Sequence, residues 1–131
     1  MMRKLLLLAV ALMVVSVPIL AQERSERVRF AKGASSKAIH GSIRGYAGVN
    51  YIIGARAGQR MTVALNSSNT FNYFNVRAPG HDDAALYDET SGDPYSGTLP
   101  ETGDYRIQVY LMRNAARRGE SADYILTISI E

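Results

Sequence analysis

The chain has 131 residues, with no cysteine and no tryptophan. Without cysteine it forms neither a disulfide framework nor a thiolate metal site, so a fold of this length depends on one hydrophobic core. Its 15 basic and 12 acidic residues give a formal net charge of +3.

The first 21 residues predict a secretory signal peptide. Arg3 and Lys4 precede an apolar run over residues 5–17, shorter than the ~20 residues of a membrane-spanning helix, and Ala21 offers a small residue for cleavage. An uncleaved anchor helix is the less favoured alternative. We therefore expect an exported protein with one mature domain over residues 22–131 and no membrane attachment after cleavage. Thirteen basic and twelve acidic residues remain, and a net charge near +1 does not indicate a nucleic-acid partner.

Charge is distributed unevenly along the mature chain. Residues 22–77 contain nine basic and two acidic residues. Residues 78–104 contain no Lys or Arg and seven acids, namely Asp82, Asp83, Asp88, Glu89, Asp93, Glu101 and Asp104. This acidic block is either a solvated surface or a face that attracts a cationic partner.

Alternation of apolar and polar residues predicts an all-β fold. The pattern is strongest in residues 60–66, 105–112 and 123–130, and weaker in residues 27–31, 37–44, 50–56, 71–77 and 84–87. Turn residues separate these segments at short intervals. We predict an antiparallel β-sandwich of about seven or eight short strands, whose edge strands would permit a homodimer.

One short segment favours a helix. Residues 113–118 have high helix propensity, and Arg113 and Arg117, four residues apart, would share one face of a helical turn. There they either grip carboxylates together or belong to a solvated connection that Glu120 and Asp123 partly neutralise.

Catalysis and metal binding are weakly indicated. His40 and His81 are the only candidate bases, and nothing in the spacing demands a triad of Ser91, His81 and Asp82. The acids Asp82, Asp83 and Asp88, with His81, do not match a calcium-binding loop. We expect no enzyme activity, no catalytic or metal-ligating residue and no cofactor.

The stretch SGDPYSGTLPETGD, residues 91–104, is the stronger candidate site. Gly92 and Gly97 permit tight bends and Pro94 fixes one φ angle, so Tyr95 could be presented on a stiff loop. Hydroxyls of Ser91 and Tyr95 would then donate to carboxylates of a partner. The alternative is an ordinary hairpin in which Tyr95 folds back on the core.

The whole pattern resembles a known family. The segments that carry the resemblance are FAKGASS (30–36), GSIRGY (41–46), ARAGQRMTVAL (55–65), NYFNVRAPG (72–80), SGDPYSGTLPETGDYRIQVYLMRNAARR (91–118) and ADYILTI (122–128). Together they resemble the bacterial periplasmic inhibitors of i-type lysozyme, with the inhibitors of g-type lysozyme as more distant relatives. The resemblance covers nearly all of the mature chain and implies a β-sandwich related to pre-peptidase C-terminal domains.

The resemblance also implies a binding site for lysozyme. Family members insert a loop of Ser-Gly, one or two residues and Tyr into the catalytic cleft, and the segment Arg113, Asn114, Ala116 and Arg117 resembles a second contact of the g-type inhibitors. The implied partner-binding residues are Ser91, Gly92, Asp93, Tyr95, Ser96, Arg113 and Arg117. The alternative is a carbohydrate- or protein-binding module of the pre-peptidase type, with or without bound calcium.

Overall fold

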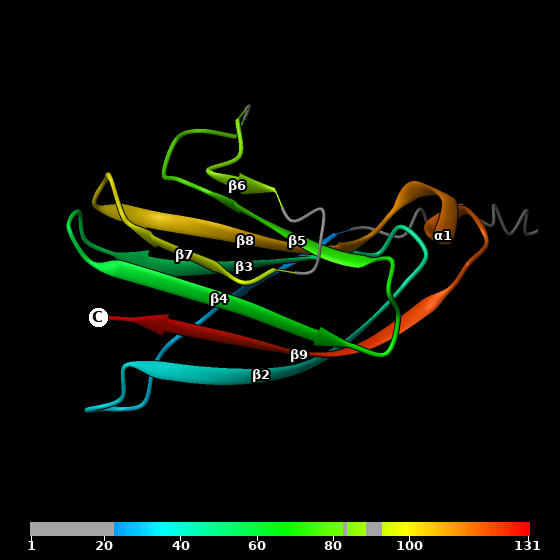
Figure 1. The fold of residues 1–131 in the computed structure, drawn as a ribbon, viewed down its shortest axis with the longest axis horizontal. Helices are drawn as coiled ribbons and strands as arrows, with labels where there is room; N and C mark the ends of the chain where they lie inside the picture. The colour runs from blue at the N-terminus through cyan, green and yellow to red at the C-terminus, as the bar shows by residue number, and fades with distance from the viewer. Residues whose placement is uncertain (1–22, 83, 89–92) are drawn as a thin grey trace, which may run out of the picture.

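Two β-sheets pack face to face in the computed structural model, which describes residues 23–82, 84–88 and 93–131 (Figure 1). The predicted signal peptide lies outside these residues. Nine strands are described: β1 (Arg24–Arg27), β2 (Ser36–Arg44), β3 (Val49–Ala55), β4 (Arg60–Ser67), β5 (Asn72–Arg77), β6 (Tyr87–Asp88), β7 (Tyr95–Thr98), β8 (Gly103–Leu111) and β9 (Ser121–Ile130). The predicted all-β sandwich is confirmed.

One sheet has five strands in the order β1-β3-β8-β5-β6, and the other has four in the order β2-β9-β4-β7. All pairings are antiparallel except β1 with β3, which is parallel. The edge strands β6 and β7 therefore belong to different sheets, and the chain passes from one sheet to the other between them.

The alternation read from the sequence places the core between the sheets. In β9 the buried residues are Ala122, Tyr124, Leu126, Ile128 and Ile130, and in β8 they are Tyr105, Ile107, Val109 and Leu111. Their neighbours along each strand face the outer surfaces. Burial of such side chains, at about 1.5–3 kcal/mol each, is the main stabilising contribution in a chain without disulfides.

Three strand predictions need correction. The predicted segment 84–87 is replaced by the two-residue strand β6, which pairs with β5 only through Tyr87 and Asp88. The predicted segment 27–31 is replaced by β1, which ends at Arg27, because the chain leaves the sheet after a last bond from the Val28 amide to the Ile52 carbonyl (2.8 Å). Strand β7 was not predicted, since its sequence YSGT carries no alternation of apolar and polar residues. It is held by pairing with β4, in which Tyr95 lies opposite Val63.

A buried pair of tyrosines joins the two sheets. The hydroxyls of Tyr51 on β3 and Tyr124 on β9 lie 2.5 Å apart and share a hydrogen bond. The Tyr124 ring occupies the space beside its cross-strand partner Gly41, where an added Cβ would lie 2.5 Å from the ring. Glycine at this position is therefore required by packing.

The short helix α1 (Arg113–Arg117) closes one end of the sandwich, opposite the C terminus (Figure 1). Its buried residues Ala115 and Ala116 belong to the hydrophobic core cluster. The predicted helical turn is confirmed, and its small residues anchor it so that Arg113 and Arg117 face solvent.

Candidate functional site

Tyr95 does not point outward. Its side chain is only 8% exposed and is part of the hydrophobic core cluster, with its ring centroid 5.3 Å from that of Tyr87. The centroid of the Tyr87 ring in turn lies 5.5 Å from that of the Phe74 ring. Burial raises the pKa of Tyr95, so its phenol stays neutral at ordinary pH. The expectation that a stiff loop presents this phenol to a partner is therefore wrong.

The position of Tyr95 follows from the way the sandwich edge is closed. Tyr87 on β6 and Tyr95 on β7 come from different sheets, and their rings fill the gap between the two edges. The Tyr87 hydroxyl also donates to the Asp93 carbonyl (2.6 Å), which fixes the chain just before β7. Tyr87 thus contacts both Asp93 and Tyr95, and the Asp93 side chain is exposed.

The other loop candidates have separate places. Ser96 is exposed on β7, and its hydroxyl lies 3.4 Å from that of Thr62. Gly97 lies beneath the Tyr95 ring, so the second Ser-Gly pair has a packing role. Ser91 and Gly92 lie outside the described residues. Of the described residues predicted for the loop contact, only Asp93 and Ser96 have exposed side chains.

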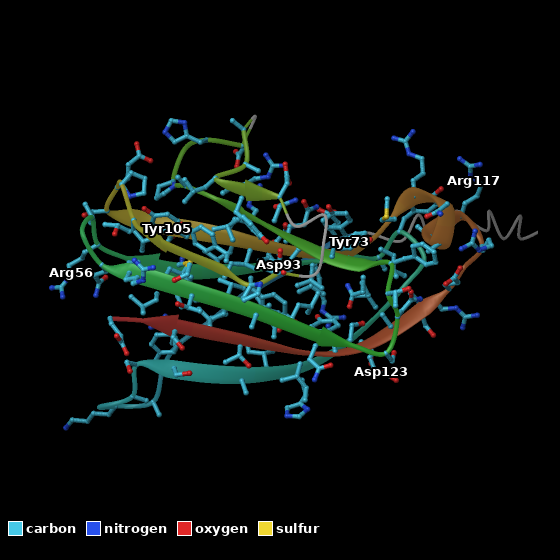
Figure 2. The ribbon with its side chains drawn as sticks, viewed as in Figure 1. Arg56, Tyr73, Asp93, Tyr105, Arg117 and Asp123 are labelled. Carbon is cyan, nitrogen blue, oxygen red and sulfur yellow. The ribbon has the colours of Figure 1, made fainter. Side chains whose placement is uncertain are left out.

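The arginines of α1 are free to bind. Within the described ranges, Arg113 and Arg117 make no ion pair, whereas Arg118 pairs with Glu120 and lies 5.7 Å from the centre of the Phe71 ring. Figure 2 shows Arg117 at the α1 end of the sandwich, while Asp93 lies near its middle. The two predicted contact regions therefore occupy different places along the molecule.

A pocket on the outer face of the five-stranded sheet lies between Arg113 of α1 and Asp88 of β6. It has a volume of about 480 Å³, and we call it the amide pocket. It is lined by Glu23, Gly45, Tyr46, Asn75, Arg77, Asp88, Gln108, Tyr110, Leu111 and Arg113. Tyr46 is 58% exposed, more than any other large hydrophobic side chain described. Arg113 from α1 and Asp88 from β6 thus line one concave surface with an exposed aromatic ring.

A hydrogen-bonded row of side chains forms the floor of the amide pocket. The Gln108 amide donates to Glu23 (2.5 Å), and the Asn75 amide donates to the Gln108 carbonyl oxygen (2.9 Å). Asn50 donates to the second oxygen of Glu23 (3.1 Å). Because a carboxylate only accepts, Glu23 fixes the orientation of Gln108 and through it that of Asn75. The floor is therefore rigid and polar.

Several carboxylates of the acidic block form ion pairs in the fold, so the block carries less unbalanced negative charge than its sequence indicates. Asp104 receives two bonds from Arg27 (3.1 and 2.7 Å), which hold the pKa of its carboxyl below the ordinary value. Asp82 pairs with Arg106 (3.1 Å), and Glu101 lies 3.1 Å from the His81 ring. Arg27 and Arg106, from outside the block, thus balance the charges of Asp104 and Asp82, which weakens the expected attraction of a cationic partner.

No catalytic or metal centre is assembled in the described part of the chain. His40 lies on β2 of the four-stranded sheet, whereas His81 contacts Glu101 beside the five-stranded sheet. Among the described residues, no three His, Cys, Asp or Glu side chains gather in a group able to hold a metal ion. No helix in these residues is long and apolar enough to cross a membrane.

Comparisons with known proteins identify relatives over most of the chain. An inhibitor of g-type lysozyme from Escherichia coli (strain K12) is 31% identical over 114 residues, 85% of this chain and 84% of that protein. The crystal structure of a periplasmic inhibitor of g-type lysozyme from Aeromonas hydrophila is 40% identical, with a TM-score of 0.79, and the match covers 83% of this chain and 98% of that one. No protein-family model matches the chain.

The pre-peptidase C-terminal domain of a Bacillus anthracis collagenase has the same fold, with a TM-score of 0.55 at 12% identity over 84% of this chain and 97% of that one. That likeness concerns the fold alone. The two more similar proteins are both named for g-type lysozyme, so the preference for i-type lysozyme that was inferred from sequence is not supported.

Sequence reasoning missed two parts of the surface just described. Tyr46 follows the end of β2 and was not recognised as a candidate, although an exposed aromatic residue beside a glycine turn is a usable signal. The row from Glu23 to Asn75 joins residues far apart in the chain, and only the strand register brings them together.

Proposed function

This chain belongs to the family of periplasmic inhibitors of g-type lysozyme, and from that premise we propose that it binds a g-type lysozyme and blocks its active-site cleft. Its relatives are inhibitors rather than enzymes, which agrees with the expectation that this chain is not an enzyme. The periplasmic location of the family agrees with the leader that we propose for residues 1–21.

The observation that carries the proposal is the pair of exposed arginines on α1, which make no ion pair with the described residues and of which Arg113 lines the amide pocket. Enzymes that cleave glycosidic bonds commonly use carboxylates, and these must stay accessible to substrate. A guanidinium group binds a carboxylate through two parallel hydrogen bonds, and loses less entropy when its helix is already anchored. Arg113 and Arg117 are placed to bind such groups, with Tyr46 as a neighbouring aromatic contact.

The connection between β6 and β7 supplies the second proposed contact. We assign contact with lysozyme to Ser91, Gly92, Asp93 and Ser96, as the family resemblance implies. Tyr95 has a different role in this proposal, because its ring is buried: it holds the end of the connection in place. Inhibition then depends on a fixed surface rather than on an inserted phenol.

A turbidity assay of cell-wall lysis tests the proposal. We expect the purified mature protein to inhibit a g-type lysozyme and to have little effect on c-type and i-type enzymes. Inhibition of the i-type enzyme alone would contradict the assignment of partner. Absence of any inhibition, with a calcium-dependent rise in melting temperature, would favour the pre-peptidase type of binding module.

Matched arginine variants test whether the α1 end of the sandwich is the surface that contacts lysozyme, with inhibition as the measurement. Arg113→Ala and Arg117→Ala should each weaken inhibition, by about tenfold or more if the arginine is an anchor. Arg56→Ala is the control, because Arg56 is exposed at the end of the sandwich opposite Arg117 (Figure 2). Equal inhibition by all three variants would place the contact elsewhere.

A further inference from the structure

Two separate segments meet at the α1 end of the sandwich (Figure 1). One is the turn over residues 44–47 between β2 and β3, which we call the Tyr46 turn. A bond from the Ala47 amide to the Arg44 carbonyl oxygen (3.1 Å) closes it. The other segment is α1. Because Tyr46 and Arg113 line the amide pocket together, the contact between the two segments decides how these side chains lie relative to each other.

Glu120, between α1 and β9, supplies that contact through its main chain. A Cβ at Gly45 would lie 3.6 Å from the Ala116 carbonyl oxygen, so the Tyr46 turn approaches the backbone of α1 closely. The Gly45 amide donates to the Glu120 carbonyl oxygen (2.9 Å), and the Glu120 amide donates to the Ala115 carbonyl oxygen (3.1 Å). One residue is thus bonded both to the Tyr46 turn and to α1.

The side chain of Glu120 is fixed from two further directions. Its Oε2 accepts a hydrogen bond from Arg118 Nε (2.6 Å), and its Oε1 accepts one from the Asn69 amide (3.1 Å). Bonds from Arg118 and then from Asn69 hold the pKa of the Glu120 carboxyl below its ordinary value. Asn69 also donates to the Ser121 carbonyl oxygen (3.1 Å) and accepts from the Phe71 amide (2.9 Å). The carboxylate is therefore attached to a connection between β4 and β5 that is itself held in place.

Helix α1 depends on such contacts. It has five residues, too few for a helix that is stable alone, and among the described residues no side chain caps its N-terminal end. Buried Ala115 and Ala116 hold it on the core, but they do not contact the Tyr46 ring through any bond described above. Glu120 is the residue whose hydrogen bonds join the helix to the Tyr46 turn.

We propose that Glu120 is a positioning residue for lysozyme binding, which holds Tyr46 and Arg113 in one preset surface. This inference rests on the proposed function. A surface that is ordered before binding loses less conformational entropy when the partner docks. In this role Glu120 acts through the Tyr46 turn and does not itself touch lysozyme.

Glu120→Ala tests the inference, with affinity for a g-type lysozyme measured by calorimetry. We expect binding to weaken by about tenfold. The substitution also frees Arg118, so a role limited to charge would instead leave binding to carboxylates unchanged or make it tighter, and either result overturns the inference.

Asp104→Ala is the matched control for Glu120→Ala. It frees Arg27 in the same way, near the start of β8, whose other end leads into α1. It should bind lysozyme as the wild type does. Melting temperatures confirm that each variant is folded.

A double-mutant cycle separates positioning from direct contact and from a general loss of stability. Tyr46→Ala should weaken binding by itself. Adding Glu120→Ala to Tyr46→Ala should weaken it by less than about twofold more, because the ring that Glu120 positions is absent. Fully additive effects would mean that Glu120 acts independently of Tyr46, and the positioning role would be wrong.

Amide hydrogen exchange of the free protein, measured by NMR, gives an independent reading. The Gly45 amide should exchange faster in Glu120→Ala than in the wild type or in Asp104→Ala. Unchanged exchange at Gly45 would contradict the inference. If wild-type protein binds a g-type lysozyme and Glu120→Ala binds it equally well, only the positioning role is wrong. If the wild type binds no g-type lysozyme, the proposed function fails and the positioning role fails with it.

Discussion

The ring of Tyr95 lies over Gly97, two residues further along strand β7. A Cβ at Gly97 would be 2.7 Å from the Tyr95 hydroxyl oxygen and 3.1 Å from the ring carbon that bears it. The same ring contacts Tyr87 from the other sheet. The sequence Tyr-Ser-Gly therefore works as a unit of packing, in which the glycine leaves room for the tyrosine to fold inward.

Gly97→Ala should destabilise the protein, because the new methyl group overlaps the buried ring. We expect a loss of about 1–3 kcal/mol in the free energy of unfolding, measured by urea denaturation. Gly54→Ala is the matched control, since a Cβ there meets only the Asp104 carboxylate at 3.6 Å. Equal effects of the two substitutions would contradict the packing described for Tyr95.

Substitutions of Tyr95 separate an anchoring role from direct contact. Tyr95→Ala should cost about 2–4 kcal/mol of unfolding free energy, as expected for loss of a large buried ring, and should weaken inhibition because the connection after β6 loosens. Tyr95→Phe keeps the ring and should retain both stability and inhibition. A Phe variant that is stable but no longer inhibits would mean that the phenol contacts lysozyme after all.

Strands with one wholly apolar face could be predicted from the sequence. Strands whose position depends on contacts with distant parts of the chain could not. Strands β8 and β9 are read directly from alternation, because every second residue is buried. Strand β7 has no such pattern, and its place depends on Val63 and Tyr87 from distant parts of the chain. The direction of the Tyr95 ring could not be predicted for the same reason.

In the candidate site, too, local features could be predicted from the sequence and long-range contacts could not. The spacing of Arg113 and Arg117 is a local property, so the shared helical face was predictable. The ion pair of Arg27 with Asp104 joins residues 77 positions apart, and it could not be foreseen from the acidic block itself. Long-range pairing thus changed the expected electrostatics more than it changed the fold.

The tyrosine pair across the core predicts loss of stability in alkali. Burial raises the pKa of both Tyr51 and Tyr124 above the ordinary value of 10.0. The unfolded chain therefore releases these protons first, and unfolding becomes easier as the pH rises above 10 toward the folded pKa values. The free energy of unfolding should then fall with pH by up to about 1.4 kcal/mol per pH unit for each tyrosine. Urea denaturation between pH 8 and 11 measures it.

A double variant identifies the source of that slope. Tyr51→Phe with Tyr124→Phe removes both hydroxyls, so stability should vary less between pH 10 and 11. Tyr46→Phe is the control, because Tyr46 is 58% exposed and should leave the alkaline slope unchanged. If the double variant keeps the full slope, other groups are responsible for it.

Glu23→Ala should weaken inhibition with little effect on stability. Removal of this carboxylate frees the amide groups of Gln108 and Asn50, and the floor of the amide pocket loses its fixed orientation. We expect several-fold weaker inhibition of a g-type lysozyme and a change in unfolding free energy below about 1 kcal/mol. Glu26→Ala is the control, since among the residues that the structure describes Glu26 forms an ion pair with the neighbouring Arg24 and no other. Comparable losses in the two variants would exclude a special role for Glu23.

The hydroxyl contact between Tyr51 and Tyr124 also bears on how the protein matures. It links the two layers by a hydrogen bond, which, unlike a disulfide, requires no oxidation. A chain with no cysteine needs no thiol oxidase or disulfide isomerase. Its folding yield should therefore be the same in reducing and oxidising surroundings, so the protein would keep its shape when envelope redox balance is disturbed.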